Sequence, residues 1–392
     1  MKHVYRQCTA CRVCGYKIEL VWDLGLQFIY SLSANNAAPL RLGVCTKCEL
    51  VQLMDTVDPD LLYKGDYYYK SGVNKTMREA LKDVVDSARR YARLKDGDLV
   101  LDIGANDGTL LNNYPKQNLL RVGFEPSWMH MTHQYTQIPG YFTAQAFREL
   151  FKDAKAKIVT ACAMFYDVAH PIEFLQDVAE IMHDEGVFII QMNYLKTMVD
   201  NCNFDNISHE HLCYYSIRDM IRITKEAGLY IEDAELNEVN GGSIRLYIRK
   251  MTDKPIGGSD RLRQLIEKEW AWYEEPIEGL PNKGIIDRID HMRFKSNQIS
   301  TGLHGAIKDK RACAVGASTR GYVILQYVGL ELPLIDRNPD KVGRSLGNMP
   351  ILGEEHIDDY EVGIVLPYHF MDEMRARYKG KKIQLINAIQ PA

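Results

Sequence analysis

Apolar runs alternate with glycine-containing turns and amphipathic stretches through the middle of the chain. Residues 74–95 place apolar side chains at helical spacing, and the run Leu99–Leu101 has the length and composition of a buried parallel strand. The turn after this strand predicts a helix that starts at Thr109. Further strands are predicted at 120–124, 157–161 and 186–191, and a further helix at 171–182. This rhythm of strands and helices predicts an α/β doubly wound sheet.

The pattern continues differently after residue 215. A helix is predicted from Ser216 to Ala227, with Gly228 in the position that commonly ends a helix. Polar helical sequence fills 260–308, and a second strand, turn and helix begin at Ala312. Two strands are predicted between these helical regions, at 230–236 and 243–248. We predict a small N-terminal domain over 1–72, the doubly wound domain over 73–255, a helical connector over 256–308 and a C-terminal Rossmann-like domain over 309–392.

Composition and charge narrow the classes of partner. The chain has 392 residues, of which 46% are hydrophobic and 26% charged, and its net charge is −4. Such values are typical of a globular protein and give no general attraction for nucleic acid or an anionic membrane. The first residues lack an apolar leader, and no apolar run approaches the roughly 20 residues that a membrane span needs. We therefore expect a cytoplasmic monomer or homodimer with a small-molecule substrate.

The nine cysteines indicate a metal site. Their number is odd and five of them precede residue 50, which argues against a secreted disulfide framework. Cys11 and Cys14 form one Cys-x-x-Cys knuckle, and Cys45 and Cys48 form a second. Each knuckle can place two thiolates on one ion, so the pair predicts a tetrahedral structural Zn²⁺ site. Cys8 has the same spacing to Cys11, but a glycine follows Cys14 and suits the tight turn of a knuckle.

The turn after Leu99–Leu101 has the composition of a nucleotide-binding loop. Gly104 lets the backbone approach a ligand closely, and Glu125 ends the next strand, where an acid can bind a ribose diol. A dinucleotide fingerprint needs glycine where this chain has Asn106, so the loop favours S-adenosylmethionine over NAD. The predicted cofactor-binding residues are Asp102, Gly104, Ala105, Asn106, Asp107, Gly108, Glu125 and Pro126.

The segment His209-Glu210-His211 is the strongest candidate for catalysis. Three consecutive titratable side chains are difficult to explain by core packing, because each would need a partner if buried. Histidine with a carboxylate is a common means of moving a proton near neutral pH. In an alternative interpretation, His209 and His211 bind zinc together with Asp205. We expect His209 to be a hydrogen-bonded neighbour of the reacting groups.

Three other features have both a structural and a functional interpretation. The tyrosines at 63–69 either fill a seam between domains or present hydroxyls, such as those of Tyr67 and Tyr69, to a pocket. The pair Gly241-Gly242 before Ser243 is either a hairpin turn or a backbone lip over a substrate. Asp167 follows a strand end, where it can face the same crevice as the His-Glu-His segment.

Four motifs, in order, look like those of the sugar C-methyltransferases of deoxysugar biosynthesis. They are the paired Cys-x-x-Cys knuckles, Asp-Ile-Gly-Ala-Asn-Asp-Gly-Thr-Leu-Leu at 102–111, Phe-Asp-Asn-Ile-Ser-His-Glu-His at 204–211 and Gly-Ala-Ser-Thr-Arg-Gly at 316–321. The resemblance covers nearly the whole chain. It implies a zinc-binding domain, a central class I methyltransferase domain that binds S-adenosylmethionine, and a C-terminal Rossmann-like domain that helps to hold a nucleotide-linked ketosugar.

The resemblance also implies roles for the central segment. By analogy His211 is the general base, and Glu210 is required beside it. The chemistry agrees, because a carbon next to a ketone becomes nucleophilic only as an enolate, which a base near neutral pKa must generate. The predicted catalytic residues are His209, Glu210, His211 and Tyr69, the last as a substitute for a family tyrosine that is Ser208 here.

The chain departs from the family pattern at its pocket. Besides Ser208, it has Ala163 and Asp167 where the family has asparagine and histidine. We therefore predict C-methylation of a different ketosugar, with substrate-binding residues Tyr67, Asp167, Ser208, Gly242, Ser243 and Arg320. The alternatives are an O- or N-methyltransferase of a small metabolite and a non-catalytic nucleotide-sugar binding protein.

Overall fold

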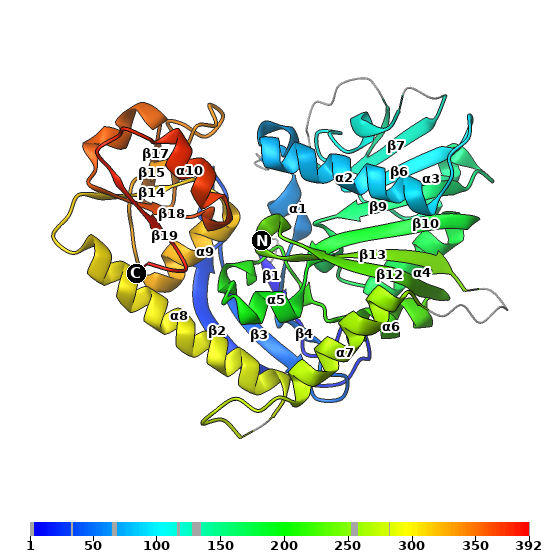
Figure 1. Cartoon of the computed structure of the whole chain (residues 1–392), viewed down its shortest axis with the longest axis horizontal. Helices are drawn as coiled ribbons and strands as arrows, with labels where there is room; N and C mark the ends of the chain where they lie inside the picture. Colours follow the sequence, from blue (N-terminus) through cyan, green and yellow to red (C-terminus); the bar gives the residue numbers. More distant parts are fainter. Residues whose placement is uncertain are drawn as a thin grey trace.

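Figure 1 shows the computed structural model of the chain. It describes residues 4–32, 34–64, 69–115, 118–127, 135–251, 258–281 and 283–391. Within these ranges the strands form sheets of two, four, six and seven strands. No helix in the same ranges is long and apolar enough to cross a membrane.

The largest sheet has seven strands in the order β12-β13-β10-β9-β6-β7-β8. Strands β8, β7, β6, β9 and β10 are parallel, and β13 is antiparallel to both of its neighbours. The strands are β6 (Leu99–Ile103), β7 (Leu120–Glu125), β8 (Thr136–Pro139), β9 (Ala156–Cys162), β10 (Met182–Asn193), β12 (Leu229–Asn237) and β13 (Ser243–Lys250). This confirms the predicted class I methyltransferase sheet. The strand order reverses at β6, where a ligand crevice is expected.

Helices cover both faces of this sheet because its inner strands are apolar on both sides. Leu99 and Leu101 of β6 belong to one hydrophobic cluster, whereas Val100 belongs to another with the inner face of α2. The helices around the sheet are α2 (Lys75–Tyr91), α3 (Ala144–Phe151), α4 (Pro171–Ile181) and α6 (Ile217–Glu226), and α5 (Leu195–Asp200) follows β10. Ser216 and Asp219 form a capping box at the start of α6, and Gly228 has φ +73° just after it, as the helix prediction required.

The C-terminal domain contains a six-stranded sheet in the order β16-β17-β15-β14-β18-β19. All but β16 run parallel, which confirms the Rossmann-like prediction. Its elements are β14 (Ala312–Val315), α9 (Thr319–Val328), β15 (Leu334–Ile335), β16 (Ser345–Leu346), β17 (Met349–Leu352), β18 (Val362–Val365), α10 (Met371–Arg377) and β19 (Gln384–Asn387). Helices α7 (Asp260–Glu274) and α8 (Ile285–Ile307) connect it to the central domain, and α8 also packs on β2 (Figure 1).

The N-terminal region forms an antiparallel sheet in the order β11-β4-β3-β2. Its strands are β2 (Ile18–Phe28), β3 (Ala37–Cys45), β4 (Val51–Leu53) and β11 (Cys213–Tyr214), with a separate pair of β1 (Tyr5–Gln7) and β5 (Asp55–Val57) and the short helix α1 (Pro59–Tyr63) nearby. Strands β2 and β3 fill the chain between the two cysteine knuckles. Strand β11 directly follows the His-Glu-His segment, so this sheet is completed by a distant part of the chain.

Two local expectations need correction. The helix predicted to start at Thr109 is wrong: only one 3-10 turn forms, Leu111–Asn113. Tyr114 is extended, with ψ 146°, because the ring of Pro115 disfavours helical backbone in the preceding residue. The structure also contains β8, an edge strand of four residues that ends in Pro139, and the helix α3 that follows it, neither of which the sequence pattern predicts.

Candidate active site

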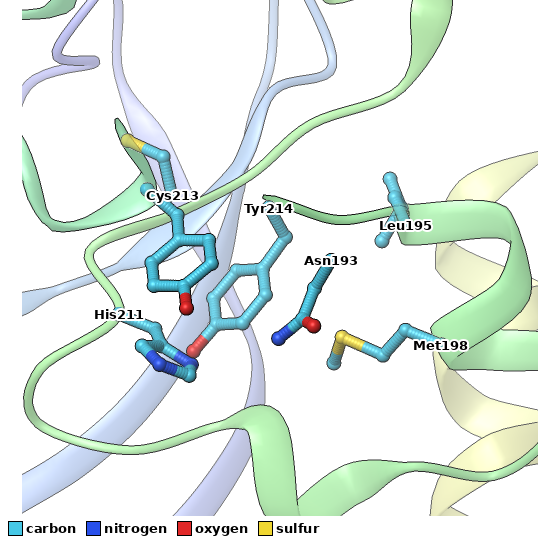
Figure 2. A pocket seen from close by; sticks show the side chains of 7 residues that line it. Asn193, Leu195, Met198, His211, Cys213 and Tyr214 are labelled. Carbon is cyan, nitrogen blue, oxygen red and sulfur yellow. The ribbon is translucent and has the colours of Figure 1, made fainter. Parts of the chain in front are cut away.

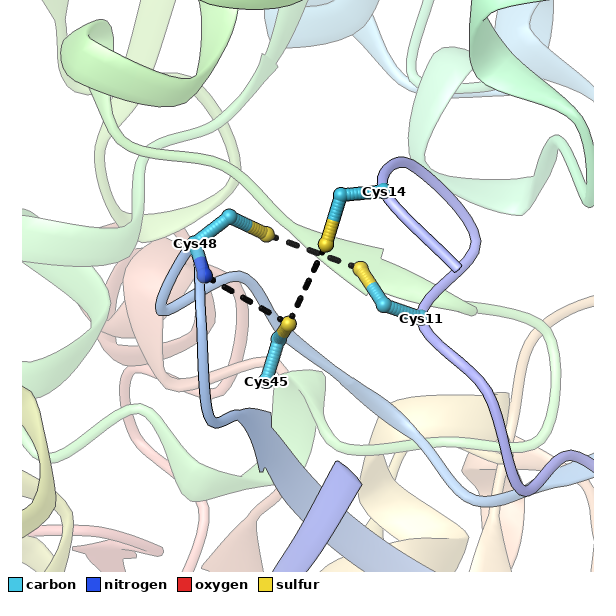
Figure 3. A group of neighbouring side chains, drawn as sticks. All are labelled: Cys11, Cys14, Cys45 and Cys48. Atoms are coloured by element: carbon cyan, nitrogen blue, oxygen red, sulfur yellow. Dashed lines mark hydrogen bonds between the residues drawn. The ribbon is translucent and has the colours of Figure 1, made fainter. Parts of the chain in front are cut away.

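The four predicted zinc ligands converge. The Sγ atoms of Cys11, Cys14, Cys45 and Cys48 all lie within 4.8 Å of one another (Figure 3). Backbone N–H groups of residues 47 and 48 donate to Cys45 Sγ, each at 3.5 Å, and hydrogen bonding from Cys48 lowers the pKa of the Cys11 thiol. Four sulfurs at this spacing fit one tetrahedral Zn²⁺ ion. Cys8 is outside the cluster, and its thiol donates to the carbonyl of Ala10 at 3.1 Å.

A cavity of about 810 Å³ lies at the carboxyl ends of β6, β7 and β9. Small-molecule sites commonly occupy about 300–1,000 Å³, so this cavity is large enough for a cofactor and a substrate. Its wall combines the loop after β6 with residues 140–143, α1, the start of α4, and Glu210 of the His-Glu-His segment. The predicted cofactor loop and the predicted catalytic segment therefore share one cavity.

Glu125 and Gly104 suit a nucleoside at one end of this cavity. The carboxylate of Glu125 accepts from the backbone N–H of Asn106 at 2.7 Å and of Ser127 at 2.9 Å. A carboxylate has about four acceptor positions, so capacity remains for ribose hydroxyls. Gly104 has φ +75°, and a Cβ there would lie 3.2 Å from the Met164 side chain. The wall thus fits S-adenosylmethionine.

Asn106 occupies the loop position where a dinucleotide fingerprint has glycine, and asparagine suits the backbone conformation found there. Its φ of +51° is left-handed, which asparagine adopts more readily than most residues. Its side chain accepts from Ser71 N at 2.9 Å and donates to the carbonyl of Tyr69 at 3.0 Å. Asn106 therefore ties the cofactor loop to the segment that enters α2.

The predicted cofactor residues divide into two groups. Gly104, Asn106, Glu125 and Pro126 line the cavity. The other four, Asp102, Ala105, Asp107 and Gly108, belong to β6 or to the loop after it but are not among the residues that line the cavity. Asp102 is buried and accepts from Thr160 Oγ1 at 2.6 Å, and burial raises its pKa to about 7. Asp107 accepts from Gly72 N at 2.7 Å.

The members of the His-Glu-His segment have three different environments. His209 is buried, and its Nε2 lies 3.1 Å from the carbonyl oxygen of Ala38 in β3. A carbonyl only accepts, so this nitrogen carries the proton. Burial lowers the pKa of His209. Its contact is with the N-terminal sheet.

His211 borders a second, water-sized cavity of about 10 Å³, together with Tyr166, Asn193 and Tyr214 (Figure 2). Its Nδ1 donates to the carbonyl of Asn206 at 2.7 Å, which leaves the Nε2 lone pair available. Burial lowers the pKa of His211 to about 4, so the ring is neutral at physiological pH. The imidazole is therefore in the protonation state that a base requires.

Glu210 is the member that lines the large cavity, together with Asp167. Thr319 Oγ1, from α9 of the C-terminal domain, donates to Glu210 Oε1 at 3.3 Å. Burial raises the pKa of Glu210 to about 7. Burial and the nearby Glu210 raise the pKa of Asp167 well above its usual value, partly offset by a hydrogen bond from Tyr63. Two carboxyl groups with increased basicity thus face the space beside the cofactor loop.

The remaining predicted site residues occupy varied positions. Tyr69 lines the large cavity, whereas Tyr67 lies outside the described residues. Ser208 is fully buried, and its hydroxyl has no hydrogen-bond partner in the described part of the chain. Gly242 and Ser243 belong to the β12–β13 hairpin, where Ser243 Oγ donates to the carbonyl of Val239 at 2.8 Å. Gly241 and Gly242 therefore lie in the turn of a hairpin, and their role as a lip over a substrate stays a prediction.

Arg320 makes an interdomain ion pair. From α9 its Nε donates to Asp205 Oδ2 at 2.7 Å, and Asp205 Oδ1 accepts from Tyr368 Oη at 2.9 Å. Arg320 Nη1 also donates to the carbonyl of Asn240 at the hairpin tip, at 2.7 Å. Among the described residues the four cysteines are the one group placed to hold a metal ion, so Asp205 does not form a zinc site with His209 and His211.

Sequence reasoning missed three groups that shape the site. Thr319 contacts Glu210, the carbonyl of Asn206 selects the His211 tautomer, and residues 140–143 line the cavity. Thr319 and Asn206 lie inside motifs that were recognised, at 316–321 and 204–211, but their partners are distant in the sequence. Residues 140–143 follow the missed strand β8, so recognition of that strand end was the signal that could have found them.

Comparisons with known proteins agree with this architecture. A zinc binding domain family matches residues 11–63, a methyltransferase domain family matches 73–234, and a C-methyltransferase C-terminal domain family matches 238–389. The curated C-methyltransferase NovU of Streptomyces niveus is 26% identical over 403 aligned residues, which cover 95% of this chain and 93% of that protein.

The solved structures named next match less than half of this chain. An S-adenosylmethionine-dependent methyltransferase from Clostridium acetobutylicum is 13% identical, with a TM-score of 0.36, over 45% of this chain and 92% of the other. A magnesium protoporphyrin IX methyltransferase from Synechocystis is 16% identical, with a TM-score of 0.35, over 47% of this chain and 91% of the other. The chain is therefore an S-adenosylmethionine-dependent methyltransferase whose three regions match, in order, families of zinc binding, methyltransferase and C-methyltransferase C-terminal domains, and it is similar to NovU over nearly its whole length.

Proposed function

We propose that this enzyme methylates the carbon next to the ketone of a nucleotide-linked ketosugar. The observation that carries the proposal is that Glu210 lines the same cavity as Gly104, Asn106 and Glu125 of the cofactor loop. A carbon acid needs a base at the point where the methyl group is delivered. S-adenosylmethionine, when bound, supplies that electrophilic methyl group.

The chain supplies two candidates for removing the proton. His211 is neutral with a free Nε2, as the family resemblance requires of the base. Glu210 faces the large cavity directly, and a pKa of about 7 makes it an effective proton acceptor near neutral pH. We assign proton removal to this pair, with Glu210 as the member in contact with substrate and Asp167 as a second carboxyl group that lines the same cavity.

The position of the C-terminal domain supports a substrate with two parts. Thr319 contacts Glu210 and lies just beyond the carboxyl end of β14. Ligands of open parallel sheets bind at this edge. The edge adjoins the cavity, so a sugar in the cavity can extend its nucleotide toward the C-terminal sheet.

Solvent deuterium exchange tests the proposal. The enzyme is incubated in D₂O with candidate nucleotide ketosugars, with and without S-adenosylmethionine, and products are followed by mass spectrometry and NMR. The proposal expects deuterium at the carbon next to the ketone and a new carbon-bound methyl group. Methylation on oxygen or nitrogen without exchange would indicate the alternative transferase, and cofactor binding without any turnover would indicate a non-catalytic binding protein.

Variants then separate the two candidate bases. Glu210→Gln and His211→Asn are each compared for exchange, turnover and S-adenosylmethionine affinity. Loss of the base should reduce exchange and turnover by about 1,000-fold while leaving cofactor affinity nearly unchanged. Unaltered activity of His211→Asn would remove it as the base, and unaltered activity of Glu210→Gln would remove Glu210.

A further inference from the structure

The strand that follows the His-Glu-His segment belongs to the sheet of the zinc domain. β11 pairs antiparallel with β4, with Cys213 opposite Gln52 and Tyr214 opposite Val51. The backbone N–H of Leu53 also donates to the carbonyl of Leu212 at 2.9 Å. Residues 212–214 are thus held by backbone hydrogen bonds to a strand that lies about 160 residues earlier.

The second cysteine knuckle forms the turn that leads into β4. Cys45 ends β3, Cys48 follows within the turn, and β4 begins at Val51. Glu49, which directly follows Cys48, has φ +60°, a left-handed conformation that residues other than glycine rarely adopt. Cys45 and Cys48 would hold one ion together, and such an ion would keep this turn closed and β4 in register with β3.

Further contacts fasten the same turn to the catalytic segment. On the side before the strand, His209 Nε2 donates to the carbonyl of Ala38 in β3 at 3.1 Å. After β11, two arginines of α6 contact the knuckle. Arg222 Nη1 donates to the carbonyl of Cys48 at 3.1 Å, and Arg218 forms an ion pair with Glu49 at 2.7 Å. The segment is therefore attached to the knuckle hairpin at both of its ends.

We propose that the Cys45–Cys48 knuckle and β4 act as a positioning device for the His-Glu-His segment, so that zinc sets the geometry of proton removal without contacting substrate. The inference rests on the proposed assignment of proton removal to this segment. The cofactor loop is attached elsewhere, because its hydrogen bonds go to Tyr69, Ser71, Gly72 and Glu125. Zinc loss should therefore loosen one side of the active site and leave the other side formed.

Hydrogen exchange of the zinc-loaded full-length protein tests this selectivity. Exchange is measured for peptides covering 206–216 and for β6, before and after removal of zinc by a chelator and in Cys48→Ser. If the proposal holds, loss of zinc should make backbone exchange over 206–216 about tenfold faster or more. Exchange in β6 should stay unchanged, and the affinity for S-adenosylmethionine should stay within about twofold of that of the zinc-loaded protein. Cys8→Ser is the matched control, because it alters a cysteine of the same region outside the cluster and should change neither exchange nor zinc content.

A rescue variant completes the test. Cys48→His keeps a zinc ligand and should restore protection of 206–216 when zinc is supplied. Zinc loss that leaves 206–216 protected would overturn the proposal, and so would equal loss of protection in β6, because the predicted effect is selective. The backbone exchange measurement uses no sugar substrate, so a negative result there would leave the proposed function standing. Conversely, a negative result for deuterium incorporation into the substrate would leave the backbone exchange result unaffected.

Discussion

The central and C-terminal sheets each contain a parallel strand that leads into a glycine turn, with an acidic residue at the end of the neighbouring strand. Among the described residues, the turn of the central sheet lines the large cavity, and the turn of the C-terminal sheet does not. In the central sheet β6 leads to Gly104, and Glu125 ends the neighbouring strand. In the C-terminal sheet β14 leads to Gly316, and Asp336 follows the neighbouring strand. Both carboxylates accept backbone N–H groups of their own turn, Asn106 in the first sheet and Ala317 in the second.

The difference lies in what occupies the space above each turn. In the C-terminal sheet Lys341 Nζ donates to the carbonyl of Ala317 at 2.6 Å and lies 4.0 Å from Asp336 Oδ2. The Tyr30 hydroxyl, from the N-terminal region, donates to the same carbonyl at 3.1 Å. Glu125 has no ion-pair partner among the described residues and faces the cavity. A glycine turn with an acid therefore predicts a shape, and the surrounding side chains decide whether a ligand can use it.

The helices after the two turns differ as well. After the first turn only the 3-10 turn Leu111–Asn113 forms, whereas the second continues into α9, whose first residues bind the central domain. We expect Arg320→Met to lower the free energy of unfolding by about 3 kcal/mol, because it leaves Asp205 buried without its cation. Urea denaturation measures this. The control Arg311→Met breaks an exposed pair with Glu361 and should change stability by less than about 0.5 kcal/mol.

Cofactor affinity tests the comparison directly. Glu125→Ala should weaken S-adenosylmethionine binding by about 100-fold, or about 2.7 kcal/mol, since it removes the proposed ribose acceptor. The matched variant Asp336→Ala should leave affinity within about twofold, because its carboxylate serves its own turn. Calorimetric titration of both variants provides the measurement. Equal losses in the two would mean that the C-terminal motif also contributes to the cofactor site.

Glu210 lies between the two regions and should make stability depend on pH. Burial raises its pKa from 4.5 to about 7, so the folded state favours the protonated carboxyl. The cost of ionising it is absent below the unfolded pKa, grows as pH rises through this interval and is complete above about 7. Glu210→Gln should therefore be more stable than the parent by about 3 kcal/mol at pH 8 and equal to it at pH 4. Chemical denaturation across this range measures the difference, and a constant difference would contradict the assigned pKa.

Lys341 gives the smallest expected effect. Burial lowers its pKa, and it makes one hydrogen bond and one long ion pair. Lys341→Met should cost about 1 kcal/mol of stability through the lost hydrogen bond, with no change in S-adenosylmethionine affinity. Thermal unfolding and calorimetry provide the two readouts. Gain of binding for a nucleotide in this variant would show that Lys341 is what closes the second motif.

Features that depend on near neighbours were predicted well. The alternation of Leu99, Val100 and Leu101 defines a strand buried on both faces, and Ser216 with Gly228 marks both ends of α6. The cysteine knuckles gave the metal site because a Cys-x-x-Cys turn brings its two sulfurs together locally. Two local features were not predicted: β8 is an edge strand of only four residues and gives a weak signal, whereas Pro115 is a strong local signal against the helix expected at Thr109 that was given too little weight.

The roles within the site depended on contacts across the fold. Consecutive residues His209, Glu210 and His211 meet a carbonyl of β3, the large cavity and a water-sized cavity, respectively. The motif predicted proton chemistry from the residue types, but the environment of each side chain follows from contacts with β3, β4 and α9, whose approach no local pattern encodes. For the same reason the ion pair between Arg320, expected at the substrate, and Asp205 is seen only in the folded structure. Spacing along the chain specifies turns, strands and ligand sets, whereas long-range packing specifies which functional groups remain available.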